Sequence, residues 1–196
     1  MKNSNRKRKA LIIVDVQRDF VDGSLGSKDA QNMIPRLVKK LEGESPTTDF
    51  FFTMDTHGRN YLSTQEGKKL PVPHCIENTE GWGIHSALKD FVSAKNSIIV
   101  KKEVFGAIGL YHDLLFYDEI ELVGLCTDIC VVSNALILRS QIPNTEISVD
   151  ASCCVGTSFF AHLSALKVMQ SCQITVKNFP EDEEVKVKEI LESEMR

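Results

Sequence analysis

Hydrophobic residues along the chain form short continuous runs that alternate with segments of helical spacing. Two of these runs contain an aspartate at or near their end: residues 10–16 (ALIIVDV), with Asp15, and residues 50–55 (FFFTMD), with Asp55. Short continuous runs are typical of parallel strands that are buried on both faces of a sheet. We expect further strands at residues 97–101, 118–125, 146–150 and 173–176.

Segments with apolar residues at helical spacing separate these predicted strands. We expect helices at residues 32–41, 84–91, 130–138 and 158–169. Strands that alternate with helices pair in parallel through right-handed crossovers. The pattern therefore predicts an α/β fold of three layers (α/β/α), a doubly wound parallel sheet of about six strands, in a single domain over residues 10–196.

Two stretches lie outside this alternation. Residues 56–83 are polar and rich in glycine, proline and histidine, and a loop of this length in a compact domain is expected to be functional. After Pro180, an acidic run and an apolar stripe predict a last helix, which either covers the edge of the domain or contacts another subunit.

The composition supports a globular protein without a membrane span. The chain has 196 residues, of which 42% are hydrophobic, and no run approaches the about 20 apolar residues of a transmembrane helix. Six cysteines without a short, loop-rich framework indicate reduced thiols. We therefore expect a cytoplasmic protein.

The charge is unevenly distributed along the chain. Residues 1–9 carry five of the 23 lysine and arginine residues and no acidic residue, so all 27 acidic residues belong to the remainder. We interpret residues 1–9 as a flexible basic tail, with an anionic partner of the tail as the alternative. An acidic body does not favour binding of nucleic acid.

Cys130 is the first candidate for chemistry. The chain is expected to turn from strand to helix near residues 124–128, with Thr127 as the N-cap, so Cys130 falls in the first turn. Unpaired N–H groups and the positive end of the helix dipole there favour a thiolate and lower the pKa of the thiol. The alternative is a buried structural cysteine, which is the commoner case for a cysteine taken alone.

The ends of the predicted strands supply possible partners for this cysteine. In an open parallel sheet, ligands bind beyond the carboxyl ends of the strands. Asp15, Asp55, and Lys101 with Lys102 all lie at such ends, as does the segment CTDIC. Taken singly, the aspartates could be turn residues and the lysines solvated, but together they indicate one crevice that holds an acid, a lysine and a thiol.

Several motifs, in order and spacing, resemble the isochorismatase-like superfamily of cysteine hydrolases, and most closely its nicotinamidase branch: ALIIVDVQRDFV, TMDTH, LPVPHC, KKEVFGA and VGLCTDICV. This resemblance implies a catalytic triad of Asp15, Lys102 and Cys130. Lys102 is preferred to Lys101 because the family pattern places an aromatic residue three positions later, at Phe105. It also implies an oxyanion hole of the Cys126 and Cys130 backbone N–H groups, with a cis peptide bond before Cys126.

The resemblance also decides how the polar loop is interpreted. On spacing alone, hydrogen bonding by its histidines would be preferred to a metal site. The nicotinamidase branch binds a divalent metal, which implies Zn²⁺, with Fe²⁺ or Mn²⁺ as alternatives, on four residues: Asp55, His57, Glu66 and His74. Many relatives carry a further histidine ligand where this chain has Tyr61, and some use a glutamate instead. Glu66 is therefore the expected fourth ligand.

By the same analogy, Phe20 is expected against the substrate ring, with core packing as the alternative. Pro71 and Ile108 stand where relatives often have aromatic residues, so the pocket is expected to be reshaped. The resemblance predicts hydrolysis of a small amide, nicotinamide, to nicotinate and ammonia, in a homo-oligomer. The alternatives are a related hydrolase of another small amide or ether, and a catalytically silent paralogue that serves as a binding module.

Overall fold

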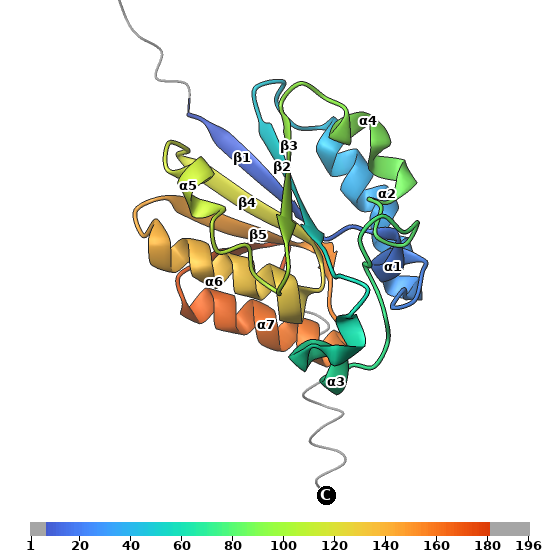
Figure 1. Ribbon diagram of the computed structural model, residues 1–196. Helices are drawn as coiled ribbons and strands as arrows, with labels where there is room; N and C mark the ends of the chain where they lie inside the picture. The colour runs from blue at the N-terminus through green and yellow to red at the C-terminus, as the bar shows by residue number, and fades with distance from the viewer. Residues whose placement is uncertain (1–6, 181–196) are drawn as a thin grey trace, which may run out of the picture.

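A six-stranded parallel sheet forms the centre of the molecule (Figure 1). The computed structural model describes residues 7–180. The strands lie in the order β3-β2-β1-β4-β5-β6, and every neighbouring pair is parallel. Their bounds are β1 Lys9–Val14, β2 Asp49–Asp55, β3 Ser97–Lys102, β4 Glu119–Leu125, β5 Glu146–Val155 and β6 Thr175–Lys177. The predicted doubly wound sheet is confirmed.

Helices cover both faces of the sheet, as Figure 1 shows. One face carries α1 Arg18–Val21, α2 Lys28–Glu42 and α4 Lys89–Val92, and the other carries α5 Tyr111–Leu114, α6 Val132–Gln141 and α7 Phe159–Ser171. Successive residues of β1 supply the two cores in turn, because strand side chains alternate between faces. Leu11 and Ile13 pack with α2, whereas Ile12 and Val14 pack with α6 and α7.

The structure extends one predicted strand and divides one predicted helix. β5 continues to Val155, five residues beyond the predicted end, because Ala151, Cys153 and Cys154 are buried there and Cys154 pairs with Gly124 of β4. The helix expected over residues 84–91 consists of a 3₁₀ turn, η2 Ser86–Leu88, and α4.

The ends of the chain bear on two further predictions. The helix predicted after Pro180 lies in residues 181–196, outside the described residues. Residues 1–6 of the predicted tail are also outside them, whereas Lys9 is the first residue of β1 and the Lys7 ammonium lies 2.8 Å from Glu119 Oε1.

The long loop after β2 is locally ordered by short helical turns. It contains η1 Tyr61–Ser63 and α3 Gln65–Lys69, and the Thr64 hydroxyl caps α3 by accepting a hydrogen bond from the Gly67 N–H at 3.0 Å. A parallel bridge between His57 and Ile76 closes the loop. The loop therefore forms a compact lobe beside the carboxyl ends of the strands.

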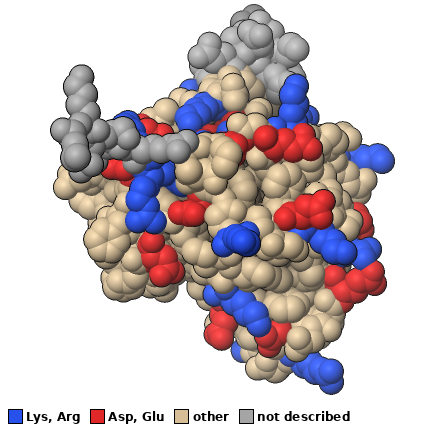
Figure 2. All heavy atoms as spheres, turned by 90° about the horizontal axis from the view of Figure 1, so that it is seen from above, with Lys and Arg blue, Asp and Glu red and all other residues tan. Residues whose placement is uncertain are grey.

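The surface seen in Figure 2 carries basic and acidic side chains side by side, without an extended basic area on that face. Within residues 7–180, no helix has the length and apolar character needed to cross a membrane.

Candidate active site and metal cluster

The carboxyl ends of four neighbouring strands bring the predicted side chains together. Asp15 follows β1, Asp55 ends β2 and Lys102 ends β3. After β4, the π-helical turn η3 Thr127–Val131 carries Cys130. All four side chains are buried, so their contacts form in a region of low dielectric constant.

Lys102 is the centre of this group. Its Nζ lies 2.7 Å from Asp15 Oδ2, 3.1 Å from Asp55 Oδ1 and 3.6 Å from Cys130 Sγ. Lys101 lies away from the group, where its ammonium pairs with Glu77 at 2.7 Å and stays half exposed. The structure thus places Lys102, rather than Lys101, beside Asp15 and Cys130.

The prediction that the helix terminus lowers the pKa of Cys130 is wrong. Burial raises the pKa of this thiol, the Asp15 carboxylate raises it further, and Lys102 only partly opposes them. Burial also raises the pKa of Asp15. The thiol therefore keeps its proton in the resting site, and a neighbouring base must remove it when the sulfur reacts.

Asp15 is held rigidly at the base of the site. It adopts a left-handed backbone conformation (φ 49°), which is uncommon for a residue other than glycine. The Thr53 hydroxyl donates to Asp15 Oδ1 at 2.7 Å, and Lys102 lies against the other carboxylate oxygen. Unusual backbone conformations of this kind often occur at functional sites.

The turn that carries Cys130 differs from the predicted one. Cys126, not Thr127, is its N-cap residue, and the Leu125–Cys126 peptide bond is cis, as the resemblance implied. The buried Thr127 hydroxyl instead lies 2.8 Å from His162 Nδ1 of α7. Asp128 accepts hydrogen bonds from the N–H and hydroxyl groups of Thr157 at 2.8 and 2.5 Å. Two contacts with the β5–α7 region therefore fix the turn.

A second cluster, the metal cluster, joins the loop to the end of β2. Its ligand atoms come from Asp55, His57, Glu66 and His74 and all lie within 4.8 Å of one another. His57 Nε2 lies 2.9 Å from Asp55 Oδ2 and 3.8 Å from Glu66 Oε1. His74 Nε2 lies 3.6 and 3.7 Å from the same two carboxylate oxygens.

These four residues fit a divalent metal ion. His57 Nε2 is buried and, although it lies 2.9 Å from Asp55 Oδ2, it has no contact of hydrogen-bond geometry in the described part of the chain. His74 Nδ1 lies 2.9 Å from the Val72 carbonyl oxygen, which leaves Nε2 directed into the cluster. Two imidazole nitrogens and two carboxylates are ligands that Zn²⁺, Fe²⁺ and Mn²⁺ accept. Tyr61 is not a member, because its hydroxyl donates to the Leu70 carbonyl oxygen at 2.9 Å.

Asp55 connects the metal cluster with Lys102. One carboxylate oxygen faces Lys102 and the other faces the two histidines. Burial alone would raise the pKa of Asp55, but the histidines and Lys102 lower it well below its usual range. Asp55 is therefore an anion shared by both groups.

One residue that sequence reasoning missed positions Asp55. The Gln17 side chain is fully buried; its amide nitrogen donates to the Asp55 carbonyl at 2.9 Å and to the Trp82 carbonyl at 2.8 Å. Its amide oxygen accepts from the Asp55 N–H at 2.7 Å. The position of Gln17, two residues after Asp15, was the only signal in the sequence.

A cavity of about 760 Å³ joins both groups. Cys130, Cys126, Asp55, Glu66 and His74 all line it. So does Phe20, whose ring centroid lies 5.4 Å from that of His74. Pro71 and Ile108 are exposed and are not among the residues that line this cavity.

Comparison with known proteins agrees with this architecture. The profile of the Isochorismatase domain matches residues 9–178. A nicotinamidase of Schizosaccharomyces pombe is 29% identical, over 85% of this chain and 91% of its own length. A nicotinamidase/pyrazinamidase of Mycobacterium tuberculosis is 27% identical, over 85% of this chain and 96% of its own.

Solved structures are similar as well. The pyrazinamidase/nicotinamidase of Streptococcus mutans has a TM-score of 0.75 at 28% identity, over 86% of this chain and 99% of its own. The pyrazinamidase of Pyrococcus horikoshii, solved in complex with zinc, has a TM-score of 0.70 at 23% identity, over 88% and 99%. At 23% identity, the similarity to the Pyrococcus horikoshii protein shows a shared fold alone.

Proposed function

Because this chain belongs to the Isochorismatase domain family, we propose that it is an amide hydrolase that converts nicotinamide to nicotinate and ammonia. The observation that carries the proposal is the contact of Lys102 with both Asp15 and Cys130 at one end of a cavity that also contains the metal cluster. Two relatives that match this chain over most of their length are named as nicotinamidases, and this supports the choice of substrate.

In the proposed mechanism, Asp15 takes the proton of the Cys130 thiol as the sulfur attacks the carboxamide carbon. Lys102 keeps Asp15 ionised before attack and stabilises the negative charge that develops. The backbone N–H groups of Cys126 and Cys130 hold the oxyanion. Asp15 then returns the proton to the nitrogen, so that ammonia leaves and a thioester remains. Water hydrolyses the thioester, which releases nicotinate and restores the thiol.

Asp55, His57, Glu66 and His74 would hold the divalent metal, and Phe20 would contact the substrate ring. When bound, the ion supplies a Lewis-acid site that positions the pyridine ring. Glu66 completes the ligand set in place of a third histidine. The cytoplasmic location and the homo-oligomeric state of this protein stay predictions.

The decisive experiment measures ammonia release from nicotinamide, pyrazinamide and several unrelated small amides. Cys130→Ala should abolish turnover while circular dichroism shows a folded domain, because the Cys130 sulfur is the one that lies 3.6 Å from Lys102 Nζ, the group that also contacts Asp15. Cys153→Ala, a buried cysteine of the other core, is the matched control and should keep most of the activity.

Two results would contradict the proposal. Loss of turnover in Cys153→Ala with activity retained in Cys130→Ala would reject the nucleophile. A folded, metal-loaded protein that releases ammonia from other small amides, but from no pyridine amide, would favour the related-hydrolase alternative instead.

A further inference from the structure

The cavity is larger than one pyridine ring with a carboxamide requires. Its volume of about 760 Å³ lies within the range of about 300–1,000 Å³ that accommodates drug-sized ligands. The nucleophile and the metal cluster lie at its buried end, since Cys130 is 5% and His74 is 2% exposed. A ring held between them would leave much of the cavity to solvent.

Three apolar side chains that line this cavity, together called the apolar wall, are partly exposed. Leu70, Val104 and Phe105 line the cavity, yet they are 38%, 51% and 46% exposed. Apolar side chains exposed at a binding site indicate a ligand that covers them, because their burial is favourable. Since nicotinamide offers only one small ring, these three residues favour a ligand with a further apolar group.

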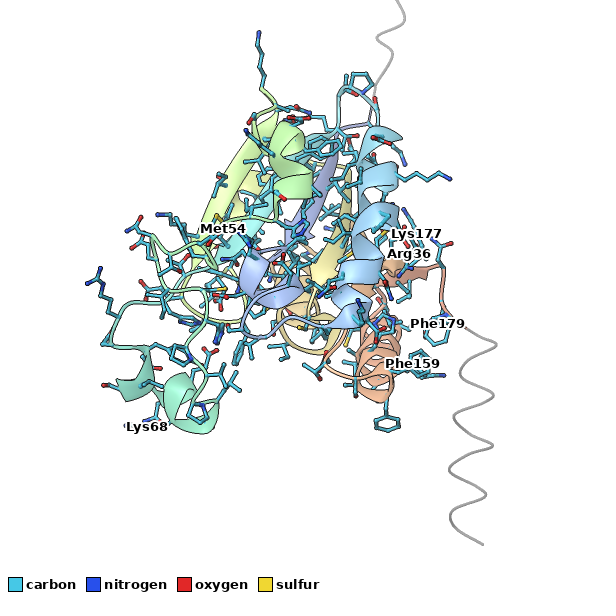
Figure 3. All side chains as sticks on the ribbon, turned by 90° about the vertical axis from the view of Figure 1, so that its right-hand side faces the viewer. Arg36, Met54, Lys68, Phe159, Lys177 and Phe179 are labelled. Atoms are coloured by element: carbon cyan, nitrogen blue, oxygen red, sulfur yellow. The ribbon has the colours of Figure 1, made fainter. Side chains whose placement is uncertain are left out.

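Charge restricts the identity of that group. Among the described residues that line the cavity, Asp55 and Glu66 belong to the metal cluster, and Lys69 is the remaining charged one. Lys68, its neighbour on α3, does not line the cavity and extends from the outer edge of that helix in Figure 3. A single lysine beside an apolar wall does not suit a phosphorylated nucleotide, which needs several donors. A neutral, apolar substituent suits the wall better.

We propose that the site takes aromatic carboxamides that carry an apolar substituent away from the amide, in preference to nicotinamide itself. This inference rests on the proposed function, because it assumes that the amide carbon lies at Cys130 and that the ring faces the metal cluster. The substituent would then extend towards Leu70, Val104 and Phe105. A substituent at ring position 5 meets this requirement, because position 5 is meta to both the amide and the ring nitrogen.

The test compares kcat/KM for nicotinamide with the values for 5-methyl-, 5-propyl- and 5-phenylnicotinamide in the metal-loaded protein. We expect kcat/KM to rise along the series, by about tenfold from the methyl to the propyl compound, since burying the two additional methylene groups changes a binding constant by about that factor. Equal or falling values, with nicotinamide still hydrolysed, would overturn this inference and leave the proposed function intact. No turnover of any member would count against both.

Two variants show whether the wall produces the preference. Val104→Ser and Leu70→Ser should each reduce the ratio of kcat/KM for 5-propylnicotinamide to that for nicotinamide about fivefold, because each removes apolar contact area. Phe116→Ser is the matched control: Phe116 is 76% exposed and does not line the cavity, so the ratio should not change.

Sedimentation velocity of the same proteins tests the other possible occupant of the wall, a second copy of the chain. A dimer that dissociates in Val104→Ser, while the substrate ratio stays constant, would assign the wall to a subunit interface and overturn the proposal. An unchanged sedimentation coefficient together with a reduced ratio would support it.

Discussion

At the scale of single residues, the Asp55 carboxylate joins the two halves of the site. Each of its oxygens contacts a different group: Lys102 on one side and the histidines of the metal cluster on the other. Glu66 differs from it, because it faces only the cluster and can be changed without touching the predicted triad. Glu66 is therefore the residue that separates metal binding from the thiol chemistry.

Glu66→Gln should weaken metal binding by at least about tenfold, because an amide oxygen replaces a charged ligand. The measurement is the metal dissociation constant from competition with a chromogenic chelator, with Zn²⁺, Fe²⁺ and Mn²⁺ tested separately. Glu77→Gln is the control, since Glu77 pairs with Lys101 at the surface. Unaltered affinity in Glu66→Gln would remove Glu66 from the ligand set.

At the scale of secondary structure, the segment after β1 positions the end of β2. The Gln17 side chain replaces a backbone partner, because it bonds both the N–H and the carbonyl of Asp55 and also reaches Trp82. The Gln17 backbone N–H also donates to the Asp15 carbonyl at 2.7 Å, so this one residue contacts both aspartates. The predicted site depends on this contact as well as on the residues that bear the chemistry.

Gln17→Glu keeps the size of the side chain but removes its two N–H donors. We expect a loss of about 1–3 kcal/mol in the free energy of unfolding, since buried carbonyls lose their partners, together with weaker metal binding. Urea denaturation and the chelator titration measure the two effects. Gln141→Glu, at the exposed end of α6, should change stability by no more than about 0.5 kcal/mol. Equal behaviour of the two variants would contradict the positioning role.

At the scale of the whole molecule, a buried ionic cluster within the sheet holds separate elements together. Glu121 of β4 is 1% exposed, and its carboxylate lies 2.9 Å from Lys9 of β1, 2.7 Å from Lys40 of α2 and 3.2 Å from Lys177 of β6. Burial tends to raise the pKa of Glu121, but the hydrogen bonds from Lys40 and Lys9 outweigh it and lower the pKa below its ordinary value of 4.5. Folding therefore favours the ionised carboxylate.

The sign of this shift predicts acid sensitivity. Above pH 4.5 the stabilisation by Glu121 is fully present, and it is lost as the pH falls towards the lower pKa of the folded state. Glu121→Gln should cost about 3 kcal/mol near pH 7, because the lysines lose their partner, and should flatten the decrease in acid. Glu119→Gln, which affects a surface pair with Lys7, should cost less than about 1 kcal/mol. The measurement is the free energy of unfolding of both variants and the parent protein from pH 3 to pH 7. If both variants matched the parent, the stabilising role of Glu121 would be contradicted.

The sequence alone determined the sheet and the residues gathered at its edge. Continuous apolar runs specify parallel strands, and the carboxyl ends of such strands meet at one edge, so Asp15, Asp55, Cys130 and either Lys101 or Lys102 could be expected together. The family motif then selected Lys102. The family motifs added the four members of the metal cluster and the cis peptide bond before Cys126. These features follow from local pattern and motif order.

Only the tertiary structure decided how these residues behave. The thiol of Cys130 has a raised pKa because burial and Asp15 outweigh Lys102, and burial depends on segments far apart in the chain. Thr127 contacts His162 instead of capping the turn, and Gln17, after β1, contacts Asp55 at the end of β2. Both contacts join residues that are far apart in the chain. The size and apolar wall of the cavity also arise from several elements at once. Local sequence patterns carry no information about such long-range contacts, and these contacts set the electrostatics and shape of the site.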